Sequence, residues 1–246
     1  MPAKLYVVHG SHPCQTVARA LELKGIAFTT VELPPPSHAP VMRVLFGRRT
    51  VPGIRFESGE KVSGSRAILR RLDELAPQPA LLPADPEARA RVVEAERWGD
   101  EVLQAAARRI FWPTLKANPG AAPSFSEGAK LPLPGAALKL AMPLVARVEL
   151  RLNHTSDAAR AADLQALPTW LQRIDDWLAD GTLGGEQPNA ADLQIAPSLK
   201  LLMTMEDLRT IIAPRPCGAW AEKLFPGGGG HIPAGSIPAG TLPAGV

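Results

Sequence analysis

A serine and a cysteine stand three residues apart where a short hydrophobic run gives way to an expected helix. Ser11 and Cys14 lie in the sequence HGSHPCQTVARALELKG, which begins at residue 9 and ends at residue 25. The first N–H groups of a helix lack intrahelical partners and carry partial positive charge, so they favour an anion. A thiolate bound there, with a hydroxyl donating a hydrogen bond to it, is stabilised over the thiol. Ser11 could therefore activate a bound thiol without being a nucleophile itself, or it could serve only as a helix N-cap.

Cys14 is the alternative reactive group in this turn. In redox proteins with a Cys-x-x-Cys motif, the first cysteine attacks and the second resolves the mixed disulfide. Here Ser11 occupies the first position, which disfavours dithiol chemistry. Cys14 shares a helical face with Val17 and Leu21, and this favours a buried, apolar thiol. Chemistry by the single thiol of Cys14 stays open.

The elements that must position these residues form a mixed α/β domain over residues 1–78. Short β-branched and aromatic runs predict strands, and apolar residues at spacings of three and four predict helices. The expected strands cover residues 4–8, 26–33, 54–57 and 61–62, and the expected helices cover residues 13–24, 41–46 and 65–75. The order is strand, helix, strand, helix, strand, strand, helix, which requires a crossover followed by a hairpin.

A linker at residues 79–85 separates this domain from an all-helical domain at residues 86–226. No convincing strand follows the linker. The expected helices cover residues 86–110, 135–152 (with a kink or break at Pro143), 156–166, 168–179 and 219–225, and one more begins after an Asn189-x-x-Asp192 cap. Residues 117–134 predict a long connection of low order because they hold four prolines and two glycines.

The last residues, 227–246, predict a loose tail. They hold the unit Ile/Leu-Pro-Ala-Gly three times, after a run of glycines. Such a composition has too little apolar mass to build a core of its own.

Composition and charge exclude several classes of function. The net charge is +3 and the basic residues are scattered among acidic ones, which disfavours a nucleic-acid surface. No run of about 18 apolar residues predicts a membrane span, and no pattern indicates a signal peptide, so we expect a cytoplasmic protein. Cys14 and Cys217 lie far apart and predict free thiols. Neither His, Cys nor acidic residues show the spacing of a metal site, so no metal is expected.

The order and spacing of four motifs resemble those of the cytosolic glutathione transferase family, over about residues 3–225. The segment GSHPCQTVARALELKGI resembles the active-site turn and first helix of the family, and TVPGIRF resembles its Val-Pro motif before the third strand. The entry to its third helix is similar to GSRAILRRLDEL, and a helix cap in its helical domain is similar to PNAADLQIAPSL. The resemblance implies a thioredoxin-like N-terminal domain followed by an all-α domain.

The resemblance also implies where glutathione would bind. In serine-type members the residue at the position of Ser11 supports the thiolate of glutathione. The family binds the cysteinyl part through the strand edge at Val51 and Pro52, which requires a cis bond before the proline. The N–H groups of the third helix and the Ser65 hydroxyl would hold the γ-glutamyl carboxylate.

Three neighbouring positions leave alternatives open. The residue before Ser65 is often Gln or Glu in the family and meets the amine of the ligand, but here it is Gly64. Arg66 could compensate, or it could be an ordinary exposed arginine. Arg49 (or Arg48) could pair with the glycyl carboxylate, or the two could form a solvated basic pair. Tyr6, the single tyrosine, is better explained by packing in its strand.

The electrophile is expected between the domains, against the long helix that follows the linker. Its candidate wall residues are His12, Trp98, Phe111 and Trp112, and the last three could instead be ordinary core. The implied activity is attack of the glutathione sulfur on a small hydrophobic electrophile, a detoxification reaction, by a protein that is a homodimer if it follows its family. Two alternatives are a non-catalytic binding or regulatory protein of the same fold and a thiol-disulfide oxidoreductase that uses Cys14.

Overall fold

The computed structural model describes residues 2–35, 37–130, 134–227 and 229–242. Its N-terminal domain contains, in chain order, β1 (Ala3–Val7), α1 (His12–Leu23), β2 (Phe28–Glu32), α2 (His38–Phe46), β3 (Gly53–Arg55), β4 (Lys61–Ser63) and α3 (Ser65–Leu75). The strands lie in the order β2-β1-β3-β4. β1 and β2 are parallel, and β3 is antiparallel to both of its neighbours. The expected crossover and hairpin are therefore confirmed, and with them the thioredoxin-like arrangement.

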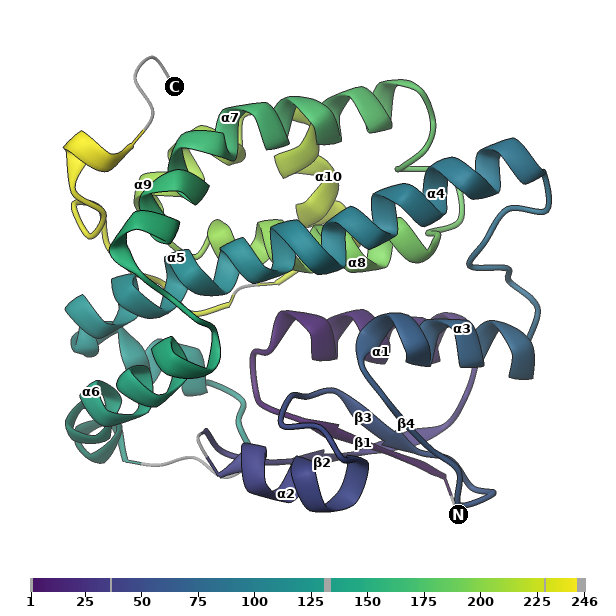
Figure 1. Cartoon of the computed structure of the whole chain (residues 1–246), viewed down its shortest axis with the longest axis horizontal. Coiled ribbons are helices and arrows are strands. Elements are labelled where there is room, and N and C mark those ends of the chain that lie inside the picture. The colour runs from purple at the N-terminus through teal and green to yellow at the C-terminus, as the bar shows by residue number, and fades with distance from the viewer. Residues whose placement is uncertain (1, 36, 131–133, 228, 243–246) are drawn as a thin grey trace.

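The sheet is covered by helices on both faces. In Figure 1, α2 lies on the outer face, and α1 and α3 lie between the sheet and the helical domain. Leu5 and Ile54 from the sheet and Val17 and Leu69 from the two inner helices are fully buried. Gly25 follows α1 with a φ of 62°, a left-handed conformation that glycine adopts without a Cβ penalty.

The helical domain follows a connection without helix or strand. Its elements are α4 (Pro86–Trp98), η1 (Gly99–Leu103), α5 (Gln104–Ala117), η2 (Pro119–Ser126), α6 (Gly135–Leu152), α7 (Asp157–Ala179), α8 (Ala190–Leu202), α9 (Glu206–Ile212), α10 (Pro216–Leu224) and η3 (Ala239–Thr241). The expected helix at residues 86–110 continues to Ala117 through the π-helical turn η1. Among the described residues, no helix combines the length and the apolar character that crossing a bilayer requires.

One expectation about proline was wrong. Residues 156–179 form one helix, α7, with Pro168 in its interior, where two helices were expected. Leu164, Leu167, Leu171 and Ile174 form a continuous buried stripe on this helix, and their packing outweighs the hydrogen bond that the proline cannot donate. Helix α6 continues through Pro143, where a kink or a break was expected, so of these two alternatives the break is absent.

The expected loose tail was also wrong for the part that the structure describes. Ile232 and Ile237, the first residues of two repeats, are 0% and 2% exposed. Ile232 N–H donates to Thr204 O (2.8 Å), and its carbonyl accepts from Glu206 N–H (3.0 Å). The Asp207 carboxylate accepts the N–H groups of Gly235 (2.7 Å) and Ile237 (2.8 Å). The tail is therefore anchored because it uses apolar sites and hydrogen-bond acceptors of the helical domain instead of a core of its own.

The two domains meet along α1 and α8. The Thr16 hydroxyl donates to Leu193 O across this interface (2.7 Å). At the other end of α1, the buried Lys24 ammonium bonds to Asp73 (2.7 Å) and to the carbonyls of Ala76 and Pro79 (both 2.6 Å). The interface and the linker thus fix α1, and with it the Ser11 turn.

Candidate functional site

The register of the sheet brings three turns to one edge. Tyr6 of β1 is paired with Gly53 of β3, and Gly53 is paired with Ser63 of β4. The turn after β1, the segment before β3 and the turn after β4 must therefore lie at the same end of the sheet. These turns carry Ser11, Val51 and Ser65, the residues that the sequence singled out.

Ser11 is the N-cap residue of α1, but its hydroxyl does not cap the helix. Its carbonyl accepts the N–H groups of Cys14 (3.0 Å) and Gln15 (3.1 Å), as an N-cap carbonyl does. Its side chain makes no capping hydrogen bond, is half-buried, and lies within hydrogen-bonding reach of the Cys14 thiol. A hydroxyl at a helix N-terminus that is not used by the helix can donate to a bound anion.

Cys14 lies one turn further along α1 and is buried. Burial raises the pKa of its thiol from 9.0 to about 11, against the opposing hydrogen bonds of Ser11 and the Val8 backbone. A thiol with this pKa carries very little thiolate at neutral pH. The side chain thus has the environment of a small core residue.

The segment before β3 presents backbone groups without partners. The Val51–Pro52 peptide bond is cis, as the family resemblance implies. The Pro52 carbonyl accepts Gly64 N–H (3.0 Å), which joins this segment to the start of α3. Among the described residues, none bonds to the N–H or the carbonyl of Val51. An extended peptide could pair with these two groups as a further strand would.

The third turn opens α3. Gly64 is its N-cap residue, with a φ of 92° and no side-chain capping bond. Ser65, the first residue of the helix, is 4% exposed. The first N–H groups of α3 are thus left for an anionic group, next to the unpaired backbone of Val51.

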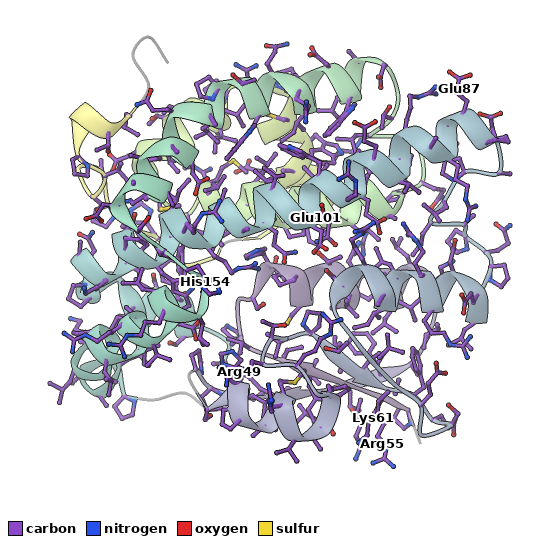
Figure 2. All side chains as sticks on the ribbon, in the orientation of Figure 1. Arg49, Arg55, Lys61, Glu87, Glu101 and His154 are labelled. Carbon is purple, nitrogen blue, oxygen red and sulfur yellow. The ribbon has the colours of Figure 1, made fainter. Side chains whose placement is uncertain are left out.

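Two predicted arginines behave differently. Arg66 pairs with the buried Glu96 (Nε to Oε2, 3.6 Å) and with Glu101 (Nη1 to Oε1, 3.4 Å), and so it holds α3 against the helical domain. Arg70 also pairs with Glu96. Burial raises the pKa of Glu96, and the two guanidinium groups oppose that rise. Arg49 is exposed and lies near the end of α2 (Figure 2). Arg66 is therefore committed to the domain interface, whereas Arg49 has the freedom to meet a ligand.

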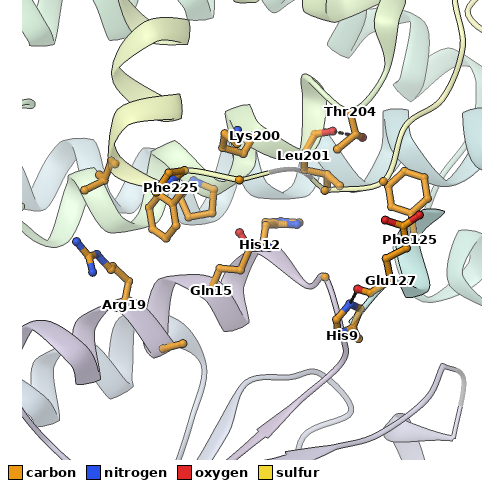
Figure 3. Close-up of a pocket in the computed structure, with 18 of the residues that line it drawn as sticks. His9, His12, Gln15, Arg19, Phe125, Glu127, Lys200, Leu201, Thr204 and Phe225 are labelled. Carbon is orange, nitrogen blue, oxygen red and sulfur yellow. Dashed lines mark hydrogen bonds between the residues drawn. The ribbon is translucent and has the colours of Figure 1, made fainter. Parts of the chain in front are cut away.

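A cleft of about 660 Å³ lies between the domains, beside the Ser11 turn (Figure 3). We call it the interdomain cleft. Gly10 and His12, on either side of Ser11, both line it, whereas Ser11, Val51 and Ser65 do not. Its other walls come from α1, α8, the end of α10, the last residues of η2 with Glu127 after it, and the glycines at the start of the tail.

The four predicted wall residues do not all line the cleft. His12 lines the cleft. Trp98 packs edge-on against Trp170 and Trp177 in the helical domain, and it is not a wall of the cleft. Phe111 lies behind the wall: it contacts Trp112 and also Phe125, which does line the cleft. Of the four residues, only His12 faces the open space directly, and the roles of all four stay predictions.

Sequence reasoning missed several residues of the cleft. They are Phe125, Lys200, Lys223 and Phe225. Phe125 lies in the proline-rich connection, which folds back on the N-terminal domain through a bond between His9 Nε2 and the Glu127 carbonyl (2.9 Å). No local pattern marks these residues, because their proximity depends on a connection and a tail whose paths are set by tertiary contacts. Among the described residues, no group of three His, Cys, Asp or Glu side chains could hold a metal ion.

Comparison with known proteins agrees with this geometry. Residues 5–80 match the family model described as "Glutathione S-transferase, N-terminal domain". A maleylacetoacetate isomerase from Pseudomonas aeruginosa is 34% identical over 93 residues, which is 36% of this chain and 44% of the isomerase. The matched part thus spans less than half the length of that relative.

Solved structures share the whole fold. A glutathione S-transferase from Rhodospirillum rubrum superposes with a TM-score of 0.59 at 21% identity, over 90% of this chain and 87% of its own. A theta class glutathione S-transferase from Xanthomonas axonopodis pv. citri, with glutathione bound, superposes with a TM-score of 0.55 at 21% identity, over 81% of this chain and 82% of its own. At these identities the likeness shows the fold and not the reaction.

Proposed function

Since the N-terminal domain of this chain belongs to the glutathione S-transferase family and the whole chain has that family's fold, we propose that the protein is a glutathione-dependent transferase. The observation that carries the proposal is the meeting of three turns at one sheet edge. They bring together the Ser11 hydroxyl, which does not cap α1, the unpaired backbone groups of Val51 and the start of α3, which has no side-chain cap. Glutathione has three matching parts: a thiol, a central peptide and a γ-glutamyl carboxylate.

Each turn would hold one part of the tripeptide. The N–H and carbonyl of Val51 would pair with the cysteinyl residue as a short antiparallel ladder. The Ser65 hydroxyl and the first N–H groups of α3 would bind the γ-glutamyl carboxylate. Arg49 would be available for the glycyl carboxylate, because it is exposed and precedes Val51 by two residues. Gly64 offers no side chain for the ligand's amine, and Arg66 is held by Glu96 and Glu101.

Ser11 would supply the chemistry. A free thiol has a pKa of about 8.5 and is mostly protonated at neutral pH. A hydrogen bond from the Ser11 hydroxyl and the positive end of α1 would favour the thiolate, and the thiol proton would leave to solvent. The sulfur lone pair would then form a bond to an electrophilic carbon, whose leaving group departs with its bonding electrons. Cys14 takes no part, since its thiol is buried and its pKa is raised to about 11.

The similarity to a maleylacetoacetate isomerase favours a second candidate, a glutathione-dependent isomerase. A thiolate that adds to an unsaturated substrate and later leaves again would use the same site. The two activities differ in the amount of free glutathione that remains after the reaction, because a transferase consumes glutathione and an isomerase returns it.

The test combines binding and turnover. Calorimetry should show that the parent protein binds glutathione, and an aryl halide should be conjugated by the parent and by Cys14→Ala but much more slowly by Ser11→Ala. Loss with Cys14→Ala alone would point to thiol-disulfide chemistry. If the parent protein shows neither binding of glutathione nor turnover, the result would favour a non-catalytic protein of this fold. Recovery of all the glutathione after conversion of an unsaturated acid would favour the isomerase.

A further inference from the structure

We propose that the outer face of the sheet in the N-terminal domain is a docking surface for a carboxylate-rich helical segment of another protein. The surface is a row of three basic side chains on neighbouring strands, Lys4 of β1, Arg55 of β3 and Lys61 of β4, which we call the basic row. It lies at the other end of the sheet from the Ser11 turn, so the proposal is independent of the proposed function.

The register of the strands puts the three side chains of the basic row side by side. Lys4 is paired with Arg55, and Arg55 is paired with Lys61. Residues directly opposite each other in antiparallel strands point to the same face of the sheet. Since neighbouring strands lie about 4.8 Å apart, the basic row extends about 10 Å across the sheet.

The basic row lies on the outer face of the sheet and is open to solvent. Leu5 and Ile54 alternate with it along β1 and β3, and both are fully buried on the inner face, where α1 and α3 pack. Helix α2 covers the outer face two residues further along β1, where Phe46 packs edge-on against Tyr6 (5.2 Å between ring centroids). All three side chains of the basic row are left exposed. Figure 2 shows the two from β3 and β4 projecting away from the helical domain.

The protein does not neutralise the basic row. Residues 1–78 hold eleven lysines and arginines but only six aspartates and glutamates, so basic side chains must remain without an acidic partner. Glu60 and Glu74, next to β4 and on α3, are both engaged by Arg71 (2.9 and 3.0 Å). Glu57, two residues after Arg55, interacts with another group of the chain. Among the described residues, none forms an ion pair with the basic row.

The three charges repel one another in the free protein. Like charges directly opposite each other in an antiparallel pair destabilise a sheet, and the basic row contains two such pairs. A line of carboxylates placed along the row would compensate both repulsions at once. The charge pattern is therefore complementary to a row of acidic groups.

The length of the basic row suits carboxylates on one face of a helix. Acidic side chains at positions i, i+3 or i+4, and i+7 share a face, and they span about 10.5 Å because a helix rises about 1.5 Å per residue. This span matches the length of the row. Clusters that bind anionic membranes hold about four to eight basic residues, and nucleic-acid surfaces present a longer basic stripe. Three cations in one line thus favour a protein segment.

The experiment uses two alanine-rich helical peptides of equal length as probes. One carries glutamate at positions i, i+4 and i+7, and the other carries glutamine there. Titrated into the isotope-labelled full chain at low salt, the glutamate peptide should shift the amide NMR signals of the basic row, and the glutamine peptide should not. The triple variant Lys4→Gln, Arg55→Gln and Lys61→Gln should weaken binding about tenfold, as expected for the loss of three exposed ion pairs. An ionic strength of about 1 M should abolish it.

The matched control removes three exposed cations elsewhere. Lys139, Arg147 and Arg151 of α6 are exposed, and none forms an ion pair with another described residue. Their joint change to glutamine lowers the net charge by the same amount and should leave peptide binding unchanged. The triple variant of the basic row should keep or raise the Tm of the parent protein, because it relieves the repulsion between the strands.

Several outcomes would overturn the proposal. They are equal binding of the two peptides, an equal loss with the α6 control, and a fall in Tm in the triple variant of the basic row. Binding of phosphatidylserine vesicles or of a nucleic-acid duplex that depends on the row and is tighter than that of the peptide would assign the surface to another class of partner. Sedimentation that shows self-association through the row would assign it to a second copy of this chain.

Glutathione separates this proposal from the proposed function. The triple variant of the basic row should bind and conjugate glutathione as the parent protein does, because the row lies away from the Ser11 turn. Peptide binding without any glutathione-dependent activity would sink the transferase and leave the docking surface. Conjugation without peptide binding would have the opposite meaning.

Discussion

The first turns of α1 and α8 begin in the same way and serve different ends. At α8, the Asn189 side chain accepts the N–H groups of Ala191 (2.9 Å) and Asp192 (3.1 Å), and the Asp192 carboxylate accepts Asn189 N–H (2.8 Å). At α1, Ser11 has the extended backbone of an N-cap, with φ −66° and ψ 116°, but its side chain makes no capping bond. The start of α8 is capped by side chains, whereas at α1 the Ser11 carbonyl accepts the N–H groups of Cys14 and Gln15, and the Ser11 hydroxyl lies beside the Cys14 thiol without capping the helix.

The difference follows from where each helix start lies. The N-terminus of α8 is buried in the helical domain, where an unpaired N–H or carboxylate oxygen has a high free-energy cost. The first residues of α1 are buried as well, but its N-cap residue Ser11 is half-buried and lies at the sheet edge where Val51 and Ser65 also lie. We conclude that an N-cap serine whose side chain does not cap its helix can mark a binding site when it lies beside other polar groups without partners.

The largest expected effect is on the bound thiol. Ser11→Ala removes one hydrogen bond to an anion, worth about 1.5–3 kcal/mol, and should raise the pKa of enzyme-bound glutathione by about 1–2 units. The conjugation rate at neutral pH should fall about 10- to 100-fold. Ultraviolet titration of the bound thiolate and steady-state kinetics measure the two quantities.

The free energy of unfolding of Ser11→Ala should change by no more than about 0.5 kcal/mol, because the side chain does not cap α1. A loss of about 1 kcal/mol or more, with an unchanged thiol pKa, would show that Ser11 is only a cap.

The converse change is Asp192→Ala. It removes the acceptor of two part-buried N–H hydrogen bonds, from Asn189 (2.8 Å) and Gly184 (2.7 Å), and should lower the free energy of unfolding by about 2 kcal/mol. The pKa of bound glutathione should stay as in the parent protein. Urea denaturation measures the first quantity, and a shift of the thiol pKa as large as that of Ser11→Ala would break the comparison.

Asp192 also predicts a pH dependence of smaller size. Burial raises its pKa from 3.8 to about 6, and the N–H groups of Asn189 and Gly184 oppose this rise. The folded protein therefore binds this proton more tightly than the unfolded chain. The contribution to stability is present at low pH and is lost as the pH rises through about 6, with a slope of at most about 1.4 kcal/mol per pH unit.

Asp192→Asn cannot titrate, so its free energy of unfolding should lack this slope between about pH 4 and pH 6 when it is compared with the parent. If the free energy of unfolding of the two proteins changed with pH in the same way, Asp192 would not be the source of the slope.

The smallest expected effect distinguishes two serines at helix starts. Ser65→Ala should raise the KM for glutathione about 3- to 30-fold, as expected for one hydrogen bond to a carboxylate. Ser156→Ala is the matched control, because the Ser156 hydroxyl accepts Ala159 N–H (3.1 Å) and caps α7. It should lower the free energy of unfolding by about 0.5–2 kcal/mol and leave the KM unchanged. If Ser65→Ala lowered the free energy of unfolding and left the KM unchanged, while Ser156→Ala raised the KM, the binding role of Ser65 would be refuted.

Local patterns were sufficient for the N-terminal domain. The crossover and the hairpin were predicted and are confirmed, as is the cap at Asn189 in the helical domain. They depend on turn residues, side-chain periodicity and strand order, which act between residues close in sequence. The cis bond before Pro52 is also confirmed, but it was implied by the family resemblance and not by a local pattern. The prolines misled the prediction, since Pro168 lies inside α7, where a long buried stripe outweighs one lost hydrogen bond.

By itself, the sequence determined the order of the elements and the identity of the residues at the Ser11 turn, because helix caps, strand alternation and turn chemistry are local. Only the tertiary structure decided that Arg66 is held by Glu96, that Cys14 is buried, and that Ile232 docks beside Met205. It also decided which side chains line the interdomain cleft. Burial and charge pairing depend on partners far away in sequence, and no local pattern specifies which partner a side chain will meet.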